Sequence, residues 1–195
     1  MQVGVLALQG DFEAHQRRLA ELDVPSVQVR APAELDGLDG LVFPGGESTA
    51  MLKLLEGSGL ENAVVDFAEK KPVLATCAGV ILLAREVRSP AQRSFAVLDV
   101  AVERNAYGRQ LDSSIRRLQP EPSFAERTSA GELEAVFIRA PIIRRCGGAV
   151  QTLVRDGEVP VLVEQANVLA ATFHPELSAD ARVHSLFLDK IKQSA

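Results

Sequence analysis

The chain has 195 residues, of which 47% are hydrophobic and 24% charged, as in a globular protein large enough for one substantial domain. Its formal charge of −5 gives no electrostatic reason to expect nucleic acid, whose binders usually carry a basic face. No apolar run approaches the roughly 20 residues that span a membrane, and the N-terminal stretch lacks the features of a signal peptide. We therefore expect a cytoplasmic protein whose two cysteines, Cys77 and Cys146, stay reduced.

The first half of the chain alternates short apolar runs with amphipathic stretches. In chain order we expect a strand at 3–8, a helix at 12–22, strands at 27–29 and 41–43, helices at 48–55 and 60–70, a strand at 73–76 and a helix at 79–84. This alternation of strands and helices predicts a mostly parallel sheet with helices on both faces.

The second half of the chain is richer in strand-like segments. We expect strands at 95–102, 133–138, 150–154, 161–164 and 168–173, and a closing helix at 180–192. The strands are expected to be antiparallel additions to the sheet or a meander beside it. The polar segment 104–130 is interpreted as a long excursion. With no linker or repeat in view, we expect a single three-layer α/β domain over residues 1–195.

The stretch around Cys77 is the most informative for chemistry. A buried strand runs directly into the cysteine, which is followed by Ala78, Gly79 and a helix. This is typical of a nucleophile elbow, in which the side chain projects from a tight strand-to-helix turn and small neighbours allow close backbone approach. The following helix N-terminus favours the thiolate. A buried cysteine that packs as a small hydrophobe is the alternative. Cys146 has no such setting and is interpreted as incidental.

A cysteine nucleophile needs a base, and the chain has three histidines. His174 follows an apolar strand at its carboxyl end, where α/β sheets build their sites, and Glu176 is placed to orient its imidazole. The alternative is a turn histidine beside an acid. His15 is expected on the polar side of a helix, at the surface or an interface, and His184 on an exposed part of the last helix.

A glycine-rich loop follows the strand at 41–43. Pro44, Gly45 and Gly46 end this strand and lead into a helix, so backbone N–H groups there suit a developing oxyanion. A simple turn with Ser48 as the helix cap is the alternative. A phosphate loop is disfavoured because its lysine is missing.

Together these features resemble the class I, or triad, glutamine amidotransferases, and are most similar to the glutaminase subunits of two-component pyridoxal 5′-phosphate synthases. The motifs that carry the resemblance are Leu8-Gln9-Gly10-Asp11, Pro44-Gly45-Gly46-Glu47-Ser48-Thr49, Thr76-Cys77-Ala78-Gly79, Arg104-Asn105-Ala106-Tyr107-Gly108-Arg109-Gln110, Phe137-Ile138-Arg139-Ala140-Pro141 and Phe173-His174-Pro175-Glu176. They span nearly the whole chain in order. The one local departure is the conservative Val80, where leucine is expected, and the stretch 119–127 matches no motif of the family.

The resemblance implies a flavodoxin-like α/β fold and a role for each matching residue. Cys77 would attack the side-chain amide of glutamine, His174 would carry the proton to ammonia, and Glu176 would orient His174. Backbone N–H groups of Gly46 and Ala78 would form the oxyanion hole. Glutamine would be held by Gly46, Glu47, Ser48, Arg104, Ile138 and Arg139, and arginine is indeed suited to bind its α-carboxylate. The resemblance also implies no cofactor and no metal, and a barrel-shaped, oligomeric synthase as partner.

Three alternatives remain at this point. A glutaminase of another biosynthetic pathway would share the thiol elbow and the His-x-Glu motif, but the motifs at 104–110 and 137–141 argue against it. A thiol protease or stress protein of similar architecture normally places its histidine soon after the cysteine, whereas His174 lies far downstream of Cys77. A non-catalytic regulatory subunit would have no reason to keep the cysteine, the histidine and Glu176 together.

Overall fold

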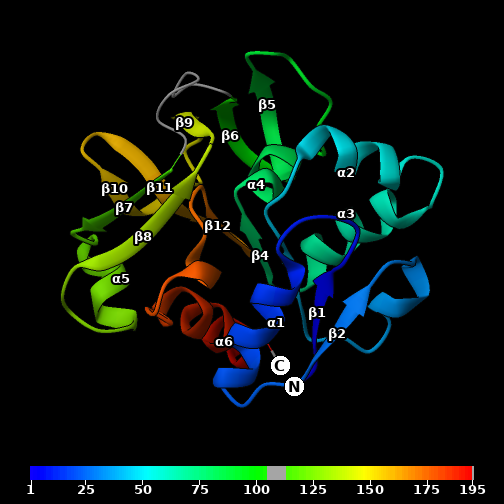
Figure 1. The fold of residues 1–195 in the computed structure, drawn as a ribbon, viewed down its shortest axis with the longest axis horizontal. Helices are drawn as coiled ribbons and strands as arrows, with labels where there is room; N and C mark the ends of the chain where they lie inside the picture. The colour runs from blue at the N-terminus through cyan, green and yellow to red at the C-terminus, as the bar shows by residue number, and fades with distance from the viewer. Residues whose placement is uncertain (105–112, 195) are drawn as a thin grey trace.

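A seven-stranded sheet forms the centre of the computed structural model, which describes residues 1–104 and 113–194 (Figure 1). The strand order is β10-β11-β12-β4-β3-β1-β2. The five strands from β12 to β2 are parallel, and β10 and β11 extend the sheet in antiparallel fashion. The strands are β1 (Val3–Leu6), β2 (Ser26–Val29), β3 (Gly40–Phe43), β4 (Val73–Thr76), β10 (Gln151–Asp156), β11 (Val159–Gln165) and β12 (Val168–Ala171).

The four inner parallel strands, β12, β4, β3 and β1, are almost entirely apolar because each contributes to two hydrophobic cores, one on each face of the sheet. Along β3, Leu41 and Phe43 belong to one core while Val42 between them belongs to the other. Along β12, Ala170 faces the first core and Leu169 the second. Side chains that alternate in direction therefore meet an apolar environment on both sides, which accounts for near-continuous hydrophobic runs in place of alternation.

Helices cover both faces of the sheet, as the sequence predicts. The helices α2 (Ser48–Leu55), α3 (Leu60–Lys70) and α4 (Ala78–Leu83) supply side chains to the first core. The helices α1 (Phe12–Glu21), α5 (Pro122–Arg127) and α6 (Arg182–Ser194) supply side chains to the second, and α1 and α6 lie in front of the sheet in Figure 1. Two short 3₁₀ turns, η1 (Pro32–Leu35) and η2 (Pro175–Leu177), complete the described helical elements. None of the described helices combines the length and apolar character that a membrane span requires.

Two smaller sheets lie beside the carboxyl ends of the central strands (Figure 1). One contains β5 (Ala84–Arg88), β6 (Leu98–Glu103) and β9 (Ile142–Cys146), with β5 and β6 parallel and β9 antiparallel to β6. The other is the antiparallel pair β7 (Ser113–Leu118) and β8 (Leu133–Ile138). These sheets bring residues from the middle of the chain to the edge at which the first-half strands end.

The predicted fold class is confirmed: a mostly parallel sheet between helices, with antiparallel strands from the second half. Of the second-half strands, β10 and β11 are antiparallel additions to the main sheet, and β6 and β8 lie in smaller sheets beside it. The expectation is wrong for β12, which is parallel to β4.

The interpretation of 104–130 as an excursion is also wrong for its described part, which contains β7 and α5. Strand β7 escapes detection because its outer face is open to solvent, with Ile115 69% exposed between polar neighbours. Helix α5 is only six residues long and has one fully buried side chain, Phe124, so it shows no helical period. Strands β5 and β9 were not expected either: β5 follows α4 without a Gly or Pro between them, and β9 turns polar at Arg144 and Arg145.

Candidate active site

Cys77 lies at the turn between β4 and α4, in the strained backbone conformation of an elbow. Its φ and ψ are 45° and −104°, and its side chain is nearly buried, with 6% of the residue exposed. Its N–H donates to the carbonyl of Ala171 at 2.9 Å. A Cβ at Gly79 would lie 2.3 Å from the carbonyl oxygen of Phe43, so this position requires glycine. The local sequence therefore fits the tight turn it was expected to form.

The strand pairing brings His174 to the same edge of the sheet as Cys77. Strands β4 and β12 are parallel neighbours in the register Thr76 to Ala171, so the chain leaves both strands at the same level. The N–H of His174 donates to the carbonyl of Val136 in β8 at 2.8 Å, which fixes the backbone beyond β12. Residues almost a hundred positions apart in the sequence thereby meet at the carboxyl ends of adjacent strands.

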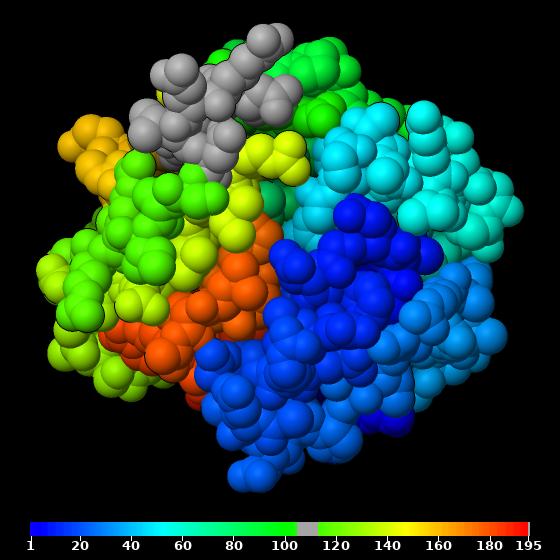
Figure 2. Space-filling model, viewed as in Figure 1, coloured from blue at the N-terminus to red at the C-terminus, as the bar shows by residue number. Residues whose placement is uncertain are grey.

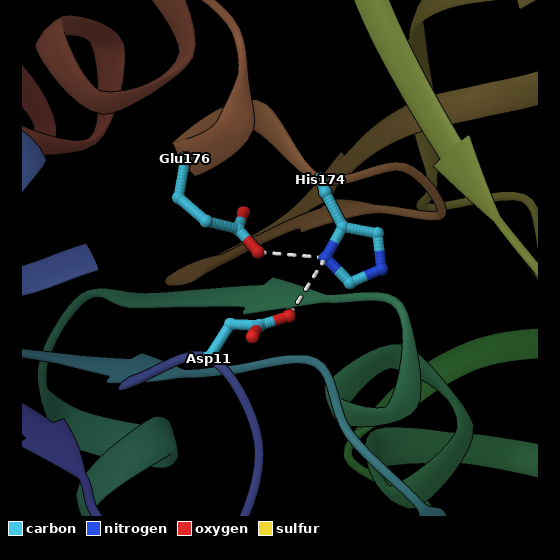
Figure 3. Close-up of side chains that lie close together, drawn as sticks. All are labelled: Asp11, His174 and Glu176. Carbon is cyan, nitrogen blue, oxygen red and sulfur yellow. Dashed lines mark hydrogen bonds and ion pairs between the residues drawn. The ribbon is translucent and has the colours of Figure 1, made fainter. Parts of the chain in front are cut away.

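Two carboxylates flank the imidazole of His174 (Figure 3). Its Nδ1 is 2.7 Å from Oε1 of the buried Glu176 and 3.7 Å from Oδ2 of Asp11, the residue before α1. Burial is the largest single influence and lowers the pKa of His174, but hydrogen bonds and charge interactions with Cys77 and Glu176 outweigh it and raise the pKa to about 10. At neutral pH the imidazole is therefore protonated, with Nδ1–H directed to Glu176.

Asp11, His174 and Glu176 each offer one ligand atom within 4.8 Å of the others, a spacing that a divalent cation can use. A metal ligand must be a free lone pair, however, and Nδ1 of His174 carries the proton that it donates to Glu176. The cluster thus fits a histidine held between acids better than it fits a metal centre.

The glycine loop after β3 packs directly against the cysteine and histidine. A Cβ at Gly45 would lie 2.6 Å from Cε1 of His174 and 3.3 Å from Cβ of Cys77, so only glycine leaves room for both. The N–H of Glu47 donates to Oε1 of Gln9 at 2.7 Å, which ties the loop to the segment before α1. The backbone of this loop consequently forms one wall of the site.

Glu47, and not Ser48, is the N-cap residue of α2, so the alternative in which Ser48 caps the helix is wrong. Its carboxylate accepts from the N–H groups of Thr49 and Ala50 at 3.2 and 2.7 Å. Partial burial raises the pKa of Glu47, but these two hydrogen bonds and the charge of Arg104 outweigh it, and the pKa is lowered. The carboxylate is therefore ionised and held at the rim of the cavity.

A cavity of about 260 Å³ opens above the cysteine. Around its mouth the N-terminal segment (blue) and the chain beyond β12 (orange) lie next to each other on the face shown in Figure 2. All six residues predicted to hold the substrate line this cavity together with the cysteine and the histidine, whereas Ala78 and Glu176 are not among its lining residues. The lining residues are Gln9, Gly10, Asp11, Gly46, Glu47, Ser48, Cys77, Ile81, Arg104, Ile138, Arg139 and His174.

Arg104 reaches the cavity from the end of β6 and is held by side chains from two other segments. Its guanidinium lies 3.5 Å from Oε1 of Glu47, donates to Oγ1 of Thr49 at 3.3 Å and donates to Oε1 of Gln92. The same oxygen of Gln92 accepts from Oγ of Ser48 at 3.0 Å. Gln92 was missed from the sequence because it lies in an irregular loop that matches no motif. The rest of the motif, residues 105–110, lies outside the described residues.

Ile138 and Arg139 also line the cavity, at the end of β8. Ile138 ends β8, and its carbonyl oxygen is 3.9 Å from Sγ of Cys77. Arg139 has a positive φ of 44°, an uncommon conformation for a residue with a side chain. The small β7–β8 sheet thus contributes backbone as well as side chains to the cysteine's surroundings.

Two sequence interpretations of histidines are wrong. His15 and His184 are both completely buried, and Nδ1 of His15 lies 3.0 Å from Nε2 of His184. His15 follows Phe12 by three positions and precedes Leu19 by four, so it lies on the apolar face of α1. His184 is likewise surrounded in α6 by buried neighbours such as Val183 and Phe187. The helical spacing was the signal that could have located them.

Comparison with known proteins agrees with this geometry. Residues 5–193 match the SNO glutamine amidotransferase family. The chain is 55% identical to the pyridoxal 5′-phosphate synthase subunit PdxT of Solibacter usitatus, and the match covers 97% of this chain and 99% of that protein. It is 50% identical to the same subunit of Koribacter versatilis, with 98% of this chain and 96% of that protein covered. It is 48% identical to the subunit of Thermus thermophilus, with 96% of each chain covered. A crystal structure of a glutamine amidotransferase superposes with a TM-score of 0.88 at 44% identity, covering 97% of this chain and 98% of that one.

The α/β fold and a cysteine at the strand-to-helix turn beside a histidine–glutamate pair define a glutamine amidotransferase. Within that class the chain belongs to the SNO glutamine amidotransferase family, whose match covers nearly its whole length. Family membership decides against the thiol protease or stress protein that the sequence alone left open.

Proposed function

We propose that this protein is the glutaminase subunit of a two-component pyridoxal 5′-phosphate synthase and hydrolyses L-glutamine to L-glutamate and ammonia. Its family and its near full-length similarity to PdxT subunits support this function. The observation that carries the chemistry is the 2.7 Å contact between His174 and Glu176, immediately beside the thiol of Cys77.

In the proposed reaction, Cys77 is the nucleophile and His174 the acid and base. Sγ attacks the side-chain amide carbon of glutamine, and the protonated imidazole gives its proton to the departing nitrogen, which leaves as ammonia. The resulting γ-glutamyl thioester is then hydrolysed by water, which His174 deprotonates, and glutamate and the free thiol are released. Glu176 keeps the imidazole oriented throughout because it accepts from Nδ1.

The substrate is proposed to occupy the 260 Å³ cavity, with its amide at Cys77. The N–H groups of Gly46 and Ala78 would bind the oxyanion of the tetrahedral intermediate. Arg104 and Arg139 would pair with the α-carboxylate of glutamine, and Glu47 would pair with its α-ammonium, because oppositely charged groups form strong charge-assisted hydrogen bonds. Glutamine would also be bound by backbone groups of Gly46 and Ile138 and by the hydroxyl of Ser48.

The ammonia would pass to a separate synthase subunit, which we propose to be barrel-shaped and oligomeric, for the synthesis of pyridoxal 5′-phosphate. The whole of residues 1–195 would act as one glutaminase domain, which the shared central sheet supports. A cytoplasmic location is also proposed, supported by two free cysteines in the described structure.

The test of this function is glutamate release from glutamine by the chain together with its synthase. Cys77→Ala should lower kcat by at least about a thousandfold, because without the thiol no thioester forms. Cys146→Ala is the matched control and should keep nearly full activity, since the half-buried Cys146 lies on β9 and does not line the cavity. Near wild-type turnover by folded Cys77→Ala protein, judged by circular dichroism, would contradict the proposal.

A further inference from the structure

A chain of buried polar groups continues behind Glu176, away from the cavity. His15 of α1 lies with its Nε2 3.3 Å from Oε2 of Glu176 and 3.2 Å from Oγ1 of Thr76. Its other ring nitrogen, Nδ1, is 3.0 Å from Nε2 of His184 in α6. The side chains of His15 and Glu176 are both completely buried, so water does not compensate for poorly matched partners.

Both of these histidines are neutral at physiological pH. Burial, and to a smaller extent the nearby His184 and His174, lowers the pKa of His15 well below its usual value. Burial, and to a smaller extent the charge of Arg18, lowers the pKa of His184 to about 3. The groups that face His15 from the surrounding elements are thus a neutral imidazole, a hydroxyl at Thr76 and the carboxylate of Glu176. Each neutral imidazole has one N–H donor and one acceptor nitrogen.

The environment decides which nitrogen carries each proton. Nδ1 of His184 is buried and has no hydrogen-bond partner among the described residues. An unpaired N–H there would cost more than an unfilled lone pair, so the proton of His184 is on Nε2 and is donated to Nδ1 of His15. The proton of His15 must then be on Nε2, where it faces the carboxylate of Glu176. The opposite arrangement would place a nitrogen lone pair against an anionic oxygen at 3.3 Å.

The two oxygens of Glu176 are therefore treated differently. Oε1 accepts from His174, whereas Oε2 is buried and has no well-aligned hydrogen bond in the described structure. The Nε2–H of His15 lies 3.3 Å from this second oxygen and is shared with Oγ1 of Thr76 at 3.2 Å. A carboxylate that is contacted on both oxygens cannot rotate freely about its terminal bond. In Glu176 this rotation matters, because the orientation of the carboxylate sets the orientation of the imidazole of His174.

We propose that His15 is a positioning residue of the glutaminase, which fixes the carboxylate of Glu176 and through it the orientation of His174. The inference rests on the proposed function and adds a residue from α1 to the support of its base. His184 donates to His15 and so keeps the proton of His15 on the nitrogen that faces Glu176.

The test compares two substitutions that differ by one methylene group. His15→Gln can place an amide N–H close to the position of Nε2, whereas the shorter side chain of His15→Asn stops near Nδ1 and cannot reach Glu176. Both keep a donor and an acceptor in the buried site, so both variants should fold. Activity is measured as glutamate release in the presence of the synthase, and the folded fraction by circular dichroism.

We expect His15→Asn to lower kcat about two- to tenfold, the range for loss of one modest polar contact, with KM changed less than about twofold. His15→Gln should recover most of that loss. In a Glu176→Gln background, His15→Asn should have little further effect, because residues that act through one another are not additive. A merely structural role would lower the folded fraction and would give additive losses.

Equal kcat for the two His15 variants, or a full additional loss in the Glu176→Gln background, would overturn the inference. Leu19→Val is the control for stability, since Leu19 is another fully buried residue of α1 that does not line the cavity; it should leave kcat unchanged per folded molecule. Absence of glutamate release by the wild-type complex would instead refute the proposed function, so the two failures are distinguishable.

Discussion

The three histidines of the chain are in environments that move their protonation in opposite directions. His174 lies between Glu176 and Cys77, which hold its proton, whereas His15 and His184 are buried away from any water that would stabilise a positive charge. From the sequence alone, the three histidines can be placed only as residues on a helix or after a strand. The sequence does not show which are buried, and burial with a specific partner is what separates a base from a neutral donor.

These environments predict an unusual histidine titration. The pKa of His174 is raised to about 10, so this imidazole should remain protonated, while His15 and His184 should remain neutral. No histidine Cε1–H resonance should therefore move between about pH 5 and about pH 8, the range in which histidine ordinarily titrates. The measurement is an NMR titration of the free protein, with the His174→Asn variant assigning one resonance.

Glu176→Gln should shift the titration of His174 to lower pH, because it removes a charge and a hydrogen bond that favour the imidazolium. The raised pKa of His174 stabilises the fold fully below about pH 6.5, its unfolded value, and this contribution is lost as pH rises toward 10. A wild-type His174 resonance that titrates near pH 6.5 would contradict this electrostatic description of the site.

At the scale of elements, the sequence predicted the strands that end at the site but not how they pair. The apolar runs at β3, β4 and β12 are clear because each is buried on both faces. That β12 lies parallel beside β4, and so brings His174 to Cys77, depends on tertiary pairing over almost a hundred residues, which no local pattern encodes. The resemblance to a family supplied that link in advance.

Two strands of the small sheets, β7 and β9, were harder to predict for a different reason. Strand β7 is packed on one side only, and β9 ends in the solvated Arg144 and Arg145. Yet these sheets deliver Arg104 from the end of β6 and Arg139 from the end of β8 to the lining of one cavity. The strands that carry these two arginines were predicted, at 95–102 and 133–138, whereas the strands that pair with them, β9 and β7, were not.

The convergence of those two sheets predicts how glutamine is held. Arg104→Ala and Arg139→Ala should each raise KM for glutamine about ten- to a hundredfold, as expected for loss of a charge-assisted bond, and should lower kcat much less. Steady-state glutamate release by the complex measures both constants. Arg144→Ala is the control: its guanidinium is exposed, pairs with Glu103 and does not line the cavity, so KM should not change. An unchanged KM in both site variants would place glutamine elsewhere.

At the scale of the whole molecule, the site is built from segments that also form its surface. Gln9 and Gly10 precede α1 and contact the glycine loop: Gln9 accepts from the N–H of Glu47, and a Cβ on Gly10 would overlap the carbonyl oxygen of Gly45. A partner that presses on the segment from Gln9 to His15 would therefore act on the proposed oxyanion loop through direct contacts. It would also act on Glu176 through His15.

We accordingly predict that the chain is a poor glutaminase alone and becomes active when its synthase binds. Ammonia released without an acceptor is wasted, and the glycines at 45 and 46 allow the loop to rest with an N–H turned away from the oxyanion. Because loss of one such donor costs roughly a hundred- to a thousandfold in rate, saturating synthase should raise kcat/KM by up to about that factor. The synthase must bind the active loop conformation more tightly than the resting one to produce this shift. The measurement is glutamate release by the chain alone and with saturating synthase, with Cys77→Ala plus synthase as the background. Equal kcat/KM in the two conditions would exclude gating by the partner while leaving the roles of Cys77 and His174 intact.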